Sequence, residues 1–281
     1  MLPAMAAPPT PEVAREERWV PGPADAPPVR VLIYSAVGSA AERPALIYMH
    51  GGGHVSGCAE SCDARCTALA REIGGVVISV DYRLAPETRF PGGIEDCYAV
   101  LRWLHAQARE LRVSSAHIAV GGESAGGGLA AALAVLARDR GGPAIAFQLL
   151  IYPMLDDRTG TSAATNAYAG EFVWTAGSNR YCWTALLGVE PGRSNVSAYA
   201  APARAEDLRG LPPAFIAVGA LDLFVDESVR YAHRLLSAGV AVELHVYPGA
   251  VHGFDLIATA QVTGAFEQQS RAAVRRALLA T

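Results

Sequence analysis

A serine surrounded by glycines stands in the stretch GGESAGGG, residues 121–128. Its centre fits the pattern G-x-S-x-G and consists of Gly122, Glu123, Ser124, Ala125 and Gly126. An apolar run that predicts a strand precedes it, and a run that predicts a helix follows it. In this context the glycines let strand and helix close around a strained turn, which exposes the serine at the helix N-terminus, where the dipole favours negative charge. We therefore expect Ser124 to be a nucleophile.

A phosphate-binding loop is the rival interpretation of the same glycines. Gly126, Gly127 and Gly128 open a stretch that satisfies G-x-G-x-x-A. In a dinucleotide fingerprint, however, these glycines belong to the loop between strand and helix, and an acidic residue ends a second strand about 20 residues later. Here they fall inside the expected helix, Asp139 ends that same helix, and no Walker lysine follows. The pattern therefore favours the nucleophile.

Two side chains stand where they could assist this serine. His252 follows a strand-like run through a Gly-Ala-Val turn, at a carboxyl end from which a general base could reach Ser124. Asp222 comes just after another strand-like run and could hold the imidazole in the required tautomer. Asp226 and Glu227 are alternatives for this role, but they fit better as first-turn acids that complement the dipole of the next helix.

A second glycine-rich stretch could stabilise the anion that a serine nucleophile creates. His50, Gly51, Gly52 and Gly53 follow a third strand-like run. Consecutive glycines allow backbone N–H groups to point into a site without obstruction by side chains. The N–H groups of Gly52 and Gly53, together with that of Ala125, are therefore predicted to bind the oxygen of a tetrahedral intermediate. A flexible loop without this role is the alternative.

The composition is that of an ordinary globular protein. Of the 281 residues, 51% are apolar and 18% are charged, and the net charge of −4 suggests neither nucleic acid nor an acidic membrane surface as a partner. The longest apolar run, 129–137, is shorter than the ~20 residues that span a bilayer. The first residues do not resemble a secretory signal, so we expect a cytoplasmic protein. No cofactor is expected.

Three of the five cysteines, Cys58, Cys62 and Cys66, recur every fourth residue. This spacing would stack them along one face of a helix. A metal site is one interpretation, but no Cys/His cluster of suitable spacing lies nearby. We interpret these cysteines as small apolar residues on a buried face, and we expect no metal.

The order of expected elements predicts the fold class. Seven short β-branched runs are typical of buried strands: 29–35, 45–50, 76–82, 117–122, 147–153, 214–219 and 242–248. Helix-like segments lie near 60–73, 94–110, 125–140, 226–239 and 263–280. This alternation predicts an α/β fold with a mostly parallel central sheet and helices on both faces. In such sheets the ligand sites collect at the carboxyl ends of the strands.

Two parts of the chain do not follow the alternation. Residues 1–28 contain eight of the 18 prolines and are expected to form an extended arm. Residues 155–205, which contain one expected helix at 177–188, interrupt the catalytic domain of residues 29–281 and are expected to cover the strand ends as a lid or small cap.

The ordered set of motifs resembles the hormone-sensitive-lipase family of microbial esterases. It comprises HGGG at 50–53, GESAG at 122–126, a downstream DLFVDE at 222–227 and HGF at 252–254. The segment DYRLAPE at 81–87 is a further hallmark, and the resemblance covers about residues 29–281. The order Ser, Asp, His along the chain is also that of α/β-hydrolases.

This resemblance implies an α/β-hydrolase fold and a carboxylesterase. Ser124, Asp222 and His252 would act on small-to-medium acyl esters with water, through an acyl-serine intermediate, and a homodimer is possible. Asp81 and Arg83 would be buried scaffold residues. The N-terminal arm, which is shorter than the helical cap usual in the family, would contribute to the cap.

The substrate pocket is less well specified. His54 replaces the aromatic residue that commonly follows HGGG, and it could bind substrate or face water. Further candidates for the pocket lining, each of which could instead belong to the core, are Val173, Trp174, Leu223 and Phe224. Two other functions stay open: an amidase or peptidase with the same triad, and a hormone-receptor-like binding protein, although the plant receptors that resemble this family have lost the histidine.

Overall fold

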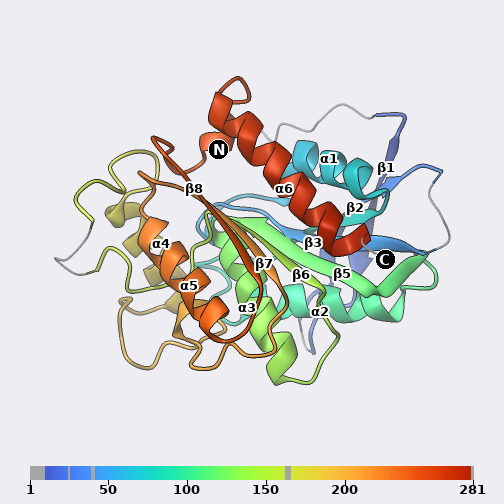
Figure 1. Ribbon diagram of the computed structural model, residues 1–281. Helices are drawn as coiled ribbons and strands as arrows, with labels where there is room; N and C mark the ends of the chain where they lie inside the picture. Colours follow the sequence, from blue (N-terminus) through green and yellow to red (C-terminus); the bar gives the residue numbers. More distant parts are fainter. Residues whose placement is uncertain (1–9, 25, 39–41, 162–165, 280–281) are drawn as a thin grey trace.

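An eight-stranded sheet forms the centre of the molecule (Figure 1). The computed structural model describes residues 10–24, 26–38, 42–161 and 166–279. The strand order is β1-β2-β4-β3-β5-β6-β7-β8, in which β1 and β2 are antiparallel to their neighbours and all other pairs are parallel. The strands are β1 (Val13–Val20), β2 (Val29–Ala36), β3 (Arg43–Met49), β4 (Val76–Asp81), β5 (Val113–Glu123), β6 (Phe147–Ile151), β7 (Ala214–Gly219) and β8 (Val242–Tyr247).

Helices cover both faces of this sheet, as the alternating pattern predicts. One apolar core lies under α2 (Gly92–Ala106), α3 (Ala125–Asp139) and α5 (Val225–Ser237). The second lies under α1 (Asp63–Ile73) and α6 (Gln261–Leu279) on the other face (Figure 1). Three short 3₁₀ helices, η1 (Ala59–Cys62), η2 (Pro202–Arg204) and η3 (Phe254–Leu256), complete the regular structure. In the described part of the chain no helix is both long and apolar enough to cross a membrane.

The N-terminal segment differs from the expected arm. Residues 13–20 form β1, which pairs with β2 along its whole length at the edge of the sheet. Only the two end valines, Val13 and Val20, are buried, and the residues between them are mostly charged and solvent-exposed. Charged side chains are typical of an edge strand, where they discourage pairing with other chains. Residues 1–9 and 25 of the expected arm lie outside the described residues.

The insertion between β6 and β7 contains the predicted helix, α4 (Ala176–Leu187). Thr175 caps its N-terminus by accepting a hydrogen bond from Ser178 N–H, and Gly188 ends it in the left-handed conformation. Trp183 and Leu186 of α4 pack into a third apolar cluster with Ala125 and Phe224. The insertion therefore packs against residues at the carboxyl ends of β5 and β7.

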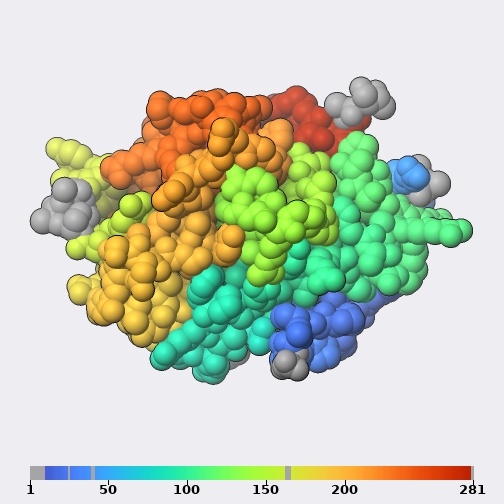
Figure 2. Space-filling view, turned by 90° about the horizontal axis from the view of Figure 1, so that it is seen from below, coloured from blue at the N-terminus to red at the C-terminus, as the bar shows by residue number. Residues whose placement is uncertain are grey.

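The space-filling view shows how the insertion and the N-terminal segment sit relative to each other on one face of the molecule. On the face in Figure 2, α2 in teal lies between the N-terminal segment in blue and the insertion in yellow to gold. On this face the two segments do not meet, because α2 separates them. Whether residues 1–9 contribute to a cap stays a prediction.

Glycines of α3 allow this helix to approach β6 closely. A Cβ atom on Gly128 would lie 2.1 Å from the Met154 carbonyl oxygen, and one on Gly127 would lie 3.0 Å from Pro153. Gly264 in α6 provides a contrast, since a Cβ atom there would meet no atom within 4 Å. The backbone contact therefore supports a packing role for Gly128.

These two helical glycines predict opposite effects of one substitution. Gly128→Ala should lower the free energy of unfolding by about 1 to 3 kcal/mol, because α3 must move away from the chain that follows β6. Gly264→Ala should raise it by about 0.5 to 1 kcal/mol, because alanine restricts the unfolded chain and favours helix. Denaturant titration of both variants measures the difference. Equal stability of the two variants would contradict the packing role.

Candidate active site

The turn around Ser124 joins the end of β5 to the start of α3 in a conformation that is rare for a residue with a side chain. Ser124 has φ 56° and ψ −120° and is 5% exposed. Its N–H donates to the Ile151 carbonyl at 2.9 Å, and its own carbonyl accepts from Met154 N–H at 3.0 Å. The neighbouring glycines are required, since a Cβ atom would lie 2.5 Å (Gly122) or 2.0 Å (Gly126) from the Met49 carbonyl oxygen.

A hydrogen-bonded chain of three side chains runs from this serine into the core. His252 Nε2 lies 3.0 Å from Ser124 Oγ, and His252 Nδ1 lies 2.7 Å from Asp222 Oδ2. A carboxylate only accepts, so Nδ1 carries the proton and the lone pair of Nε2 faces the serine hydroxyl. Asp222 is fully buried, and its other oxygen accepts from Phe224 N–H at 2.9 Å. The structure thus brings the three predicted residues together from the ends of β5, β7 and β8.

Aromatic rings enclose the His252 imidazole. The ring centroid of Phe224 lies 5.3 Å away, and that of Trp174 lies 5.7 Å away. Tyr152, which is not among the predicted site residues, is closer, with its centroid at 4.6 Å and its ring edge-on. Its position directly after β6 is a signal that could have identified it, because sites collect at the carboxyl ends of parallel strands. These rings limit both the motion of the imidazole and the access of water.

The HGGG loop presents free backbone donors. Gly52 has φ 109° and Gly53 has φ 62°, which are conformations that favour glycine. The Gly52 carbonyl accepts from Val55 N–H and Ser56 N–H, both at 3.1 Å, and so closes a turn. Within the described residues, neither the Gly52 N–H nor the Gly53 N–H donates to a protein acceptor. Ala125 is the first residue of α3, so its N–H also lacks a partner inside the helix.

His50 organises this loop from inside the protein. Its ring is fully buried, stacks on Tyr82 at 4.3 Å, and donates from Nδ1 to the Gly51 carbonyl at 2.7 Å. Tyr82 in turn donates from its hydroxyl to the His50 carbonyl at 2.8 Å. Burial lowers the pKa of His50, which keeps the ring neutral. The first histidine of HGGG is therefore a structural part of the loop.

His54, like His50, has a buried Nε2 that no described protein group satisfies. Its side chain is 4% exposed, Nε2 has no hydrogen-bond partner among the described residues, and the ring lies 6.1 Å from that of Trp183. Burial lowers the pKa of His54 to about 4. Of the two alternatives for this residue, an outward position in water is wrong.

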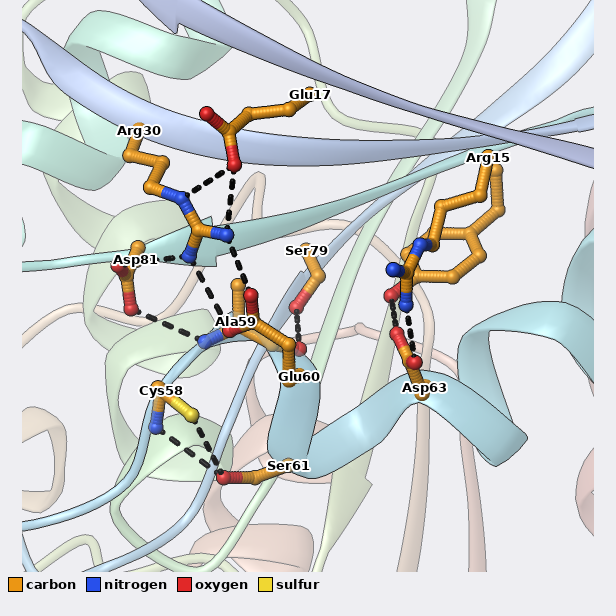
Figure 3. A network of polar contacts seen from close by, with 11 residues as sticks. Arg15, Glu17, Arg30, Cys58, Ala59, Glu60, Ser61, Asp63, Ser79 and Asp81 are labelled. Atoms are coloured by element: carbon orange, nitrogen blue, oxygen red, sulfur yellow. Dashed lines mark hydrogen bonds and ion pairs between the residues drawn. The ribbon is translucent and has the colours of Figure 1, made fainter. Parts of the chain in front are cut away.

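A network of charged residues fixes the chain that follows the HGGG loop (Figure 3). Asp81 Oδ1 accepts from Ala59 N–H at 3.0 Å, and Asp81 Oδ2 accepts from Arg30 at 3.2 Å. Arg30 also donates to Glu17 at 2.8 Å and to Glu60. The Arg30 guanidinium lowers the pKa of Glu60 to about 2. The network joins β1, β2 and β4 to η1, and so gives the N-terminal strand a connection to the site.

Arg83 orders a neighbouring loop in a similar way. It donates to both oxygens of Asp96, with distances of 2.7 and 2.8 Å, and Asp96 is fully buried. Asp81 and Arg83 themselves have side chains that are 30% and 29% exposed. The expectation that both are buried is therefore wrong, because each reaches its partner from a position near the surface.

The remaining pocket candidates are distributed over three environments. Trp174 and Phe224 meet His252, as described above, whereas Val173 is 66% exposed and has φ 62°. Leu223 is buried and lines a polar cavity of about 850 Å³ between the insertion and α5. Val173 lies at the surface, and its role in lining the pocket stays a prediction.

The alternative carboxylates do not replace Asp222. Asp226 and Glu227 both lie in the first turn of α5, as expected. Glu227 has an additional role, because its buried carboxylate accepts from Leu155 N–H at 2.6 Å and from the Thr159 hydroxyl. Burial raises the pKa of this carboxyl well above its ordinary value. Glu227 therefore holds the start of the insertion against α5.

Two of the three regularly spaced cysteines are buried, as predicted, and the third is not. Cys62 and Cys66 are buried in the core under α1, as expected. Cys58 is partly exposed and precedes η1, so the three do not share one helix. Among the described residues, no group of three or more His, Cys, Asp and Glu side chains is arranged to hold a metal ion.

Comparison with known proteins is consistent with this geometry. Residues 46–256 match the family model for the α/β-hydrolase fold. Esterase LipI of Mycobacterium tuberculosis is 41% identical over 87% of this chain and 76% of its own length. Carboxylesterase NlhH of the same organism is also 41% identical, over 84% of this chain and 74% of its own.

Solved structures show the same relationship. A bacterial heroin esterase superimposes with a TM-score of 0.94 at 44% identity and covers 98% of this chain and 88% of its own. Esterase LipW from Mycobacterium marinum has a TM-score of 0.84 at 36% identity, over 94% and 82% of the two chains. The chain therefore belongs to the α/β-hydrolase fold family, in its hormone-sensitive-lipase-like branch of carboxylesterases.

Proposed function

We propose that this carboxylesterase hydrolyses small acyl esters through an acyl-serine intermediate on Ser124. The observation that carries the proposal is the hydrogen-bonded chain from Ser124 Oγ through His252 to Asp222, at 3.0 and 2.7 Å. Its protonation pattern leaves a basic nitrogen facing the nucleophile, which is the arrangement that general-base activation of a serine requires. The relatives named as esterases support the reaction class.

Acylation follows from these positions. Ser124 Oγ attacks the ester carbonyl carbon while His252 Nε2 takes the hydroxyl proton, and buried Asp222 stabilises the imidazolium that forms. The carbonyl oxygen becomes an anion that the N–H groups of Gly52, Gly53 and Ala125 can bind. When the carbon–oxygen bond to the alcohol breaks, His252 gives its proton to the departing alkoxide oxygen. The acyl group is then left on Ser124.

Deacylation repeats the sequence with water. A water molecule loses a proton to His252 Nε2 as its oxygen attacks the acyl carbon, and the same backbone N–H groups bind the second oxyanion. Collapse of this intermediate returns the proton from His252 to Ser124 Oγ and releases the carboxylic acid. The enzyme is regenerated without a cofactor.

In this proposal the Trp174 ring limits the size of the acyl group. A Cβ atom on Gly53 would lie 2.6 Å from the tip of the Trp174 ring and 2.6 Å from Cys182 Sγ, so both side chains close the space beside this glycine. Trp174 is fixed there, because its Nε1–H donates to buried Asn179 at 3.2 Å, and Asn179 donates to the Thr159 carbonyl at 2.8 Å. Such a boundary favours short acyl groups over long ones.

Removal of the nucleophile tests the mechanism. Ser124→Ala should lower kcat for p-nitrophenyl acetate by roughly 10⁴- to 10⁶-fold, because water must then attack without covalent catalysis. The matched control is Ser237→Ala on the exposed surface of α5, which should retain full activity. Circular dichroism of both variants reports folding. Substantial activity in folded Ser124→Ala would exclude the serine mechanism.

Removal of the indole tests the size limit. Trp174→Ala should raise the ratio of kcat/KM for p-nitrophenyl hexanoate to that for acetate by about tenfold or more, because a methylene accommodated in an apolar pocket contributes ~1 kcal/mol or more. Tyr181→Ala, on the exposed side of α4, is the control and should leave this ratio unchanged. A Trp174→Ala enzyme with the wild-type ratio would show that the boundary lies elsewhere.

A further inference from the structure

One guanidinium joins the two loops that carry the nucleophile and the base. Arg65, on α1, donates from Nη2 to Asp255, and its Nε lies 3.4 Å from Glu123 Oε2. Glu123 immediately precedes Ser124, and Asp255 comes three residues after His252. The two loops arise from distant parts of the sequence, and Arg65 links them through Glu123 and Asp255.

Asp255 also binds Tyr152, whose ring lies against the His252 imidazole. Tyr152 donates from its hydroxyl to Asp255 Oδ1 at 2.7 Å, while Arg65 occupies the other oxygen. The Tyr152 ring meets His252 edge-on at 62°. Tyr152 has φ 32°, an unusual conformation for a residue with a side chain, which persists only where the surroundings hold it. The hydroxyl bond to Asp255 is one of the contacts that hold this ring beside His252, together with the bond from Tyr152 N–H to the Ala217 carbonyl at 2.6 Å.

Glu123 and Asp255 share one cation, the Arg65 guanidinium, so the connection between the two loops is sensitive to the loss of Arg65. Asp255 is 2% exposed, and Glu123 and Arg65 are 20% and 21% exposed. Burial raises the pKa of Glu123, and the Arg65 charge opposes that rise. Tyr48 donates to Glu123 at 3.2 Å, and Cys62 Sγ lies 3.5 Å from it, but neither supplies a positive charge. Without Arg65, two poorly solvated carboxylates would repel one another and the loops that carry them.

We propose that Arg65 is a positioning residue for ester hydrolysis. It holds the Ser124 loop and the His252 loop in a fixed relative position through Glu123 and Asp255. The inference rests on the proposed function of these loops. Arg65 touches no reacting atom, so its contribution is to hold the short distance between His252 Nε2 and Ser124 Oγ. Displacements of about 1 Å in such pairs can cost roughly 100-fold in rate.

Three variants separate positioning from general stabilisation. Arg65→Met should lower kcat for p-nitrophenyl acetate by about 10- to 100-fold with little change in KM, because proton transfer suffers and substrate contacts do not. Arg65→Lys should recover part of that loss by restoring the charge. The control is Arg71→Met on the same helix, since Arg71 is 60% exposed and pairs with Glu12 at 3.4 Å. Its kcat should equal that of the wild type.

A fourth variant keeps the test decisive if Arg65→Met does not fold. Tyr152→Phe removes the hydroxyl bond to Asp255 but retains the ring beside His252, and it should lower kcat roughly 3- to 10-fold at unchanged KM, in keeping with about 1 kcal/mol for one hydrogen bond.

The proposal is overturned if folded Arg65→Met has wild-type kcat and only a lower melting temperature, or if Arg65→Met does not fold and Tyr152→Phe keeps wild-type kcat. Wild-type turnover, compared with Ser124→Ala in the same assay, tests the proposed function separately. A failure of that function is therefore distinguishable from a failure of the positioning role.

Discussion

The backbone conformation of Ser124 is the constraint on which the site depends. A residue at φ 56° and ψ −120° directly between a strand and a helix must be held by its surroundings. Here β3 and β6 hold it, through the Met49 carbonyl that crowds Gly122 and Gly126 and through bonds from Ser124 to Ile151 and Met154. Because this turn lies at the carboxyl end of a central strand, Asp222 and His252 reach the serine from the ends of β7 and β8.

The HGGG loop is held in a different way. Among the described residues, the N–H groups of Gly52 and Gly53 donate to no protein acceptor, so the loop contributes little to its own rigidity. Neighbouring groups must supply that rigidity. Inside the protein, the rings of His50 and Tyr82 stack, His50 donates to the Gly51 carbonyl, and the Tyr82 hydroxyl donates to the His50 carbonyl. Beyond it, Asp81 and Arg30 anchor the start of η1 (Figure 3). Preorganised donors of this kind stabilise a developing charge without a reorganisation cost during the reaction.

Motif spacing and strand ends were sufficient to predict the fold class, the seven strands from β2 onwards and the residues that meet at Ser124. The strand β1 escaped prediction because its middle residues are charged and exposed, so its stability comes from pairing with β2 and not from an apolar pattern. The exposure of Val173 depends on how the insertion folds back, which no local pattern encodes. Arg65 was also missed, since its partners Glu123 and Asp255 come near it only in the folded chain.

In the proposed mechanism, Ser124 forms a covalent acyl-enzyme with help from His252. The most direct measurement is peptide mass mapping after treatment with a fluorophosphonate, which phosphonylates an activated serine and is not hydrolysed further. We expect one adduct, on Ser124, that forms rapidly in the wild type and at least about 100-fold more slowly in His252→Ala, since general-base assistance contributes ~10²- to 10⁴-fold. An unlabelled Ser124, or labelling that proceeds at the same rate without His252, would contradict it.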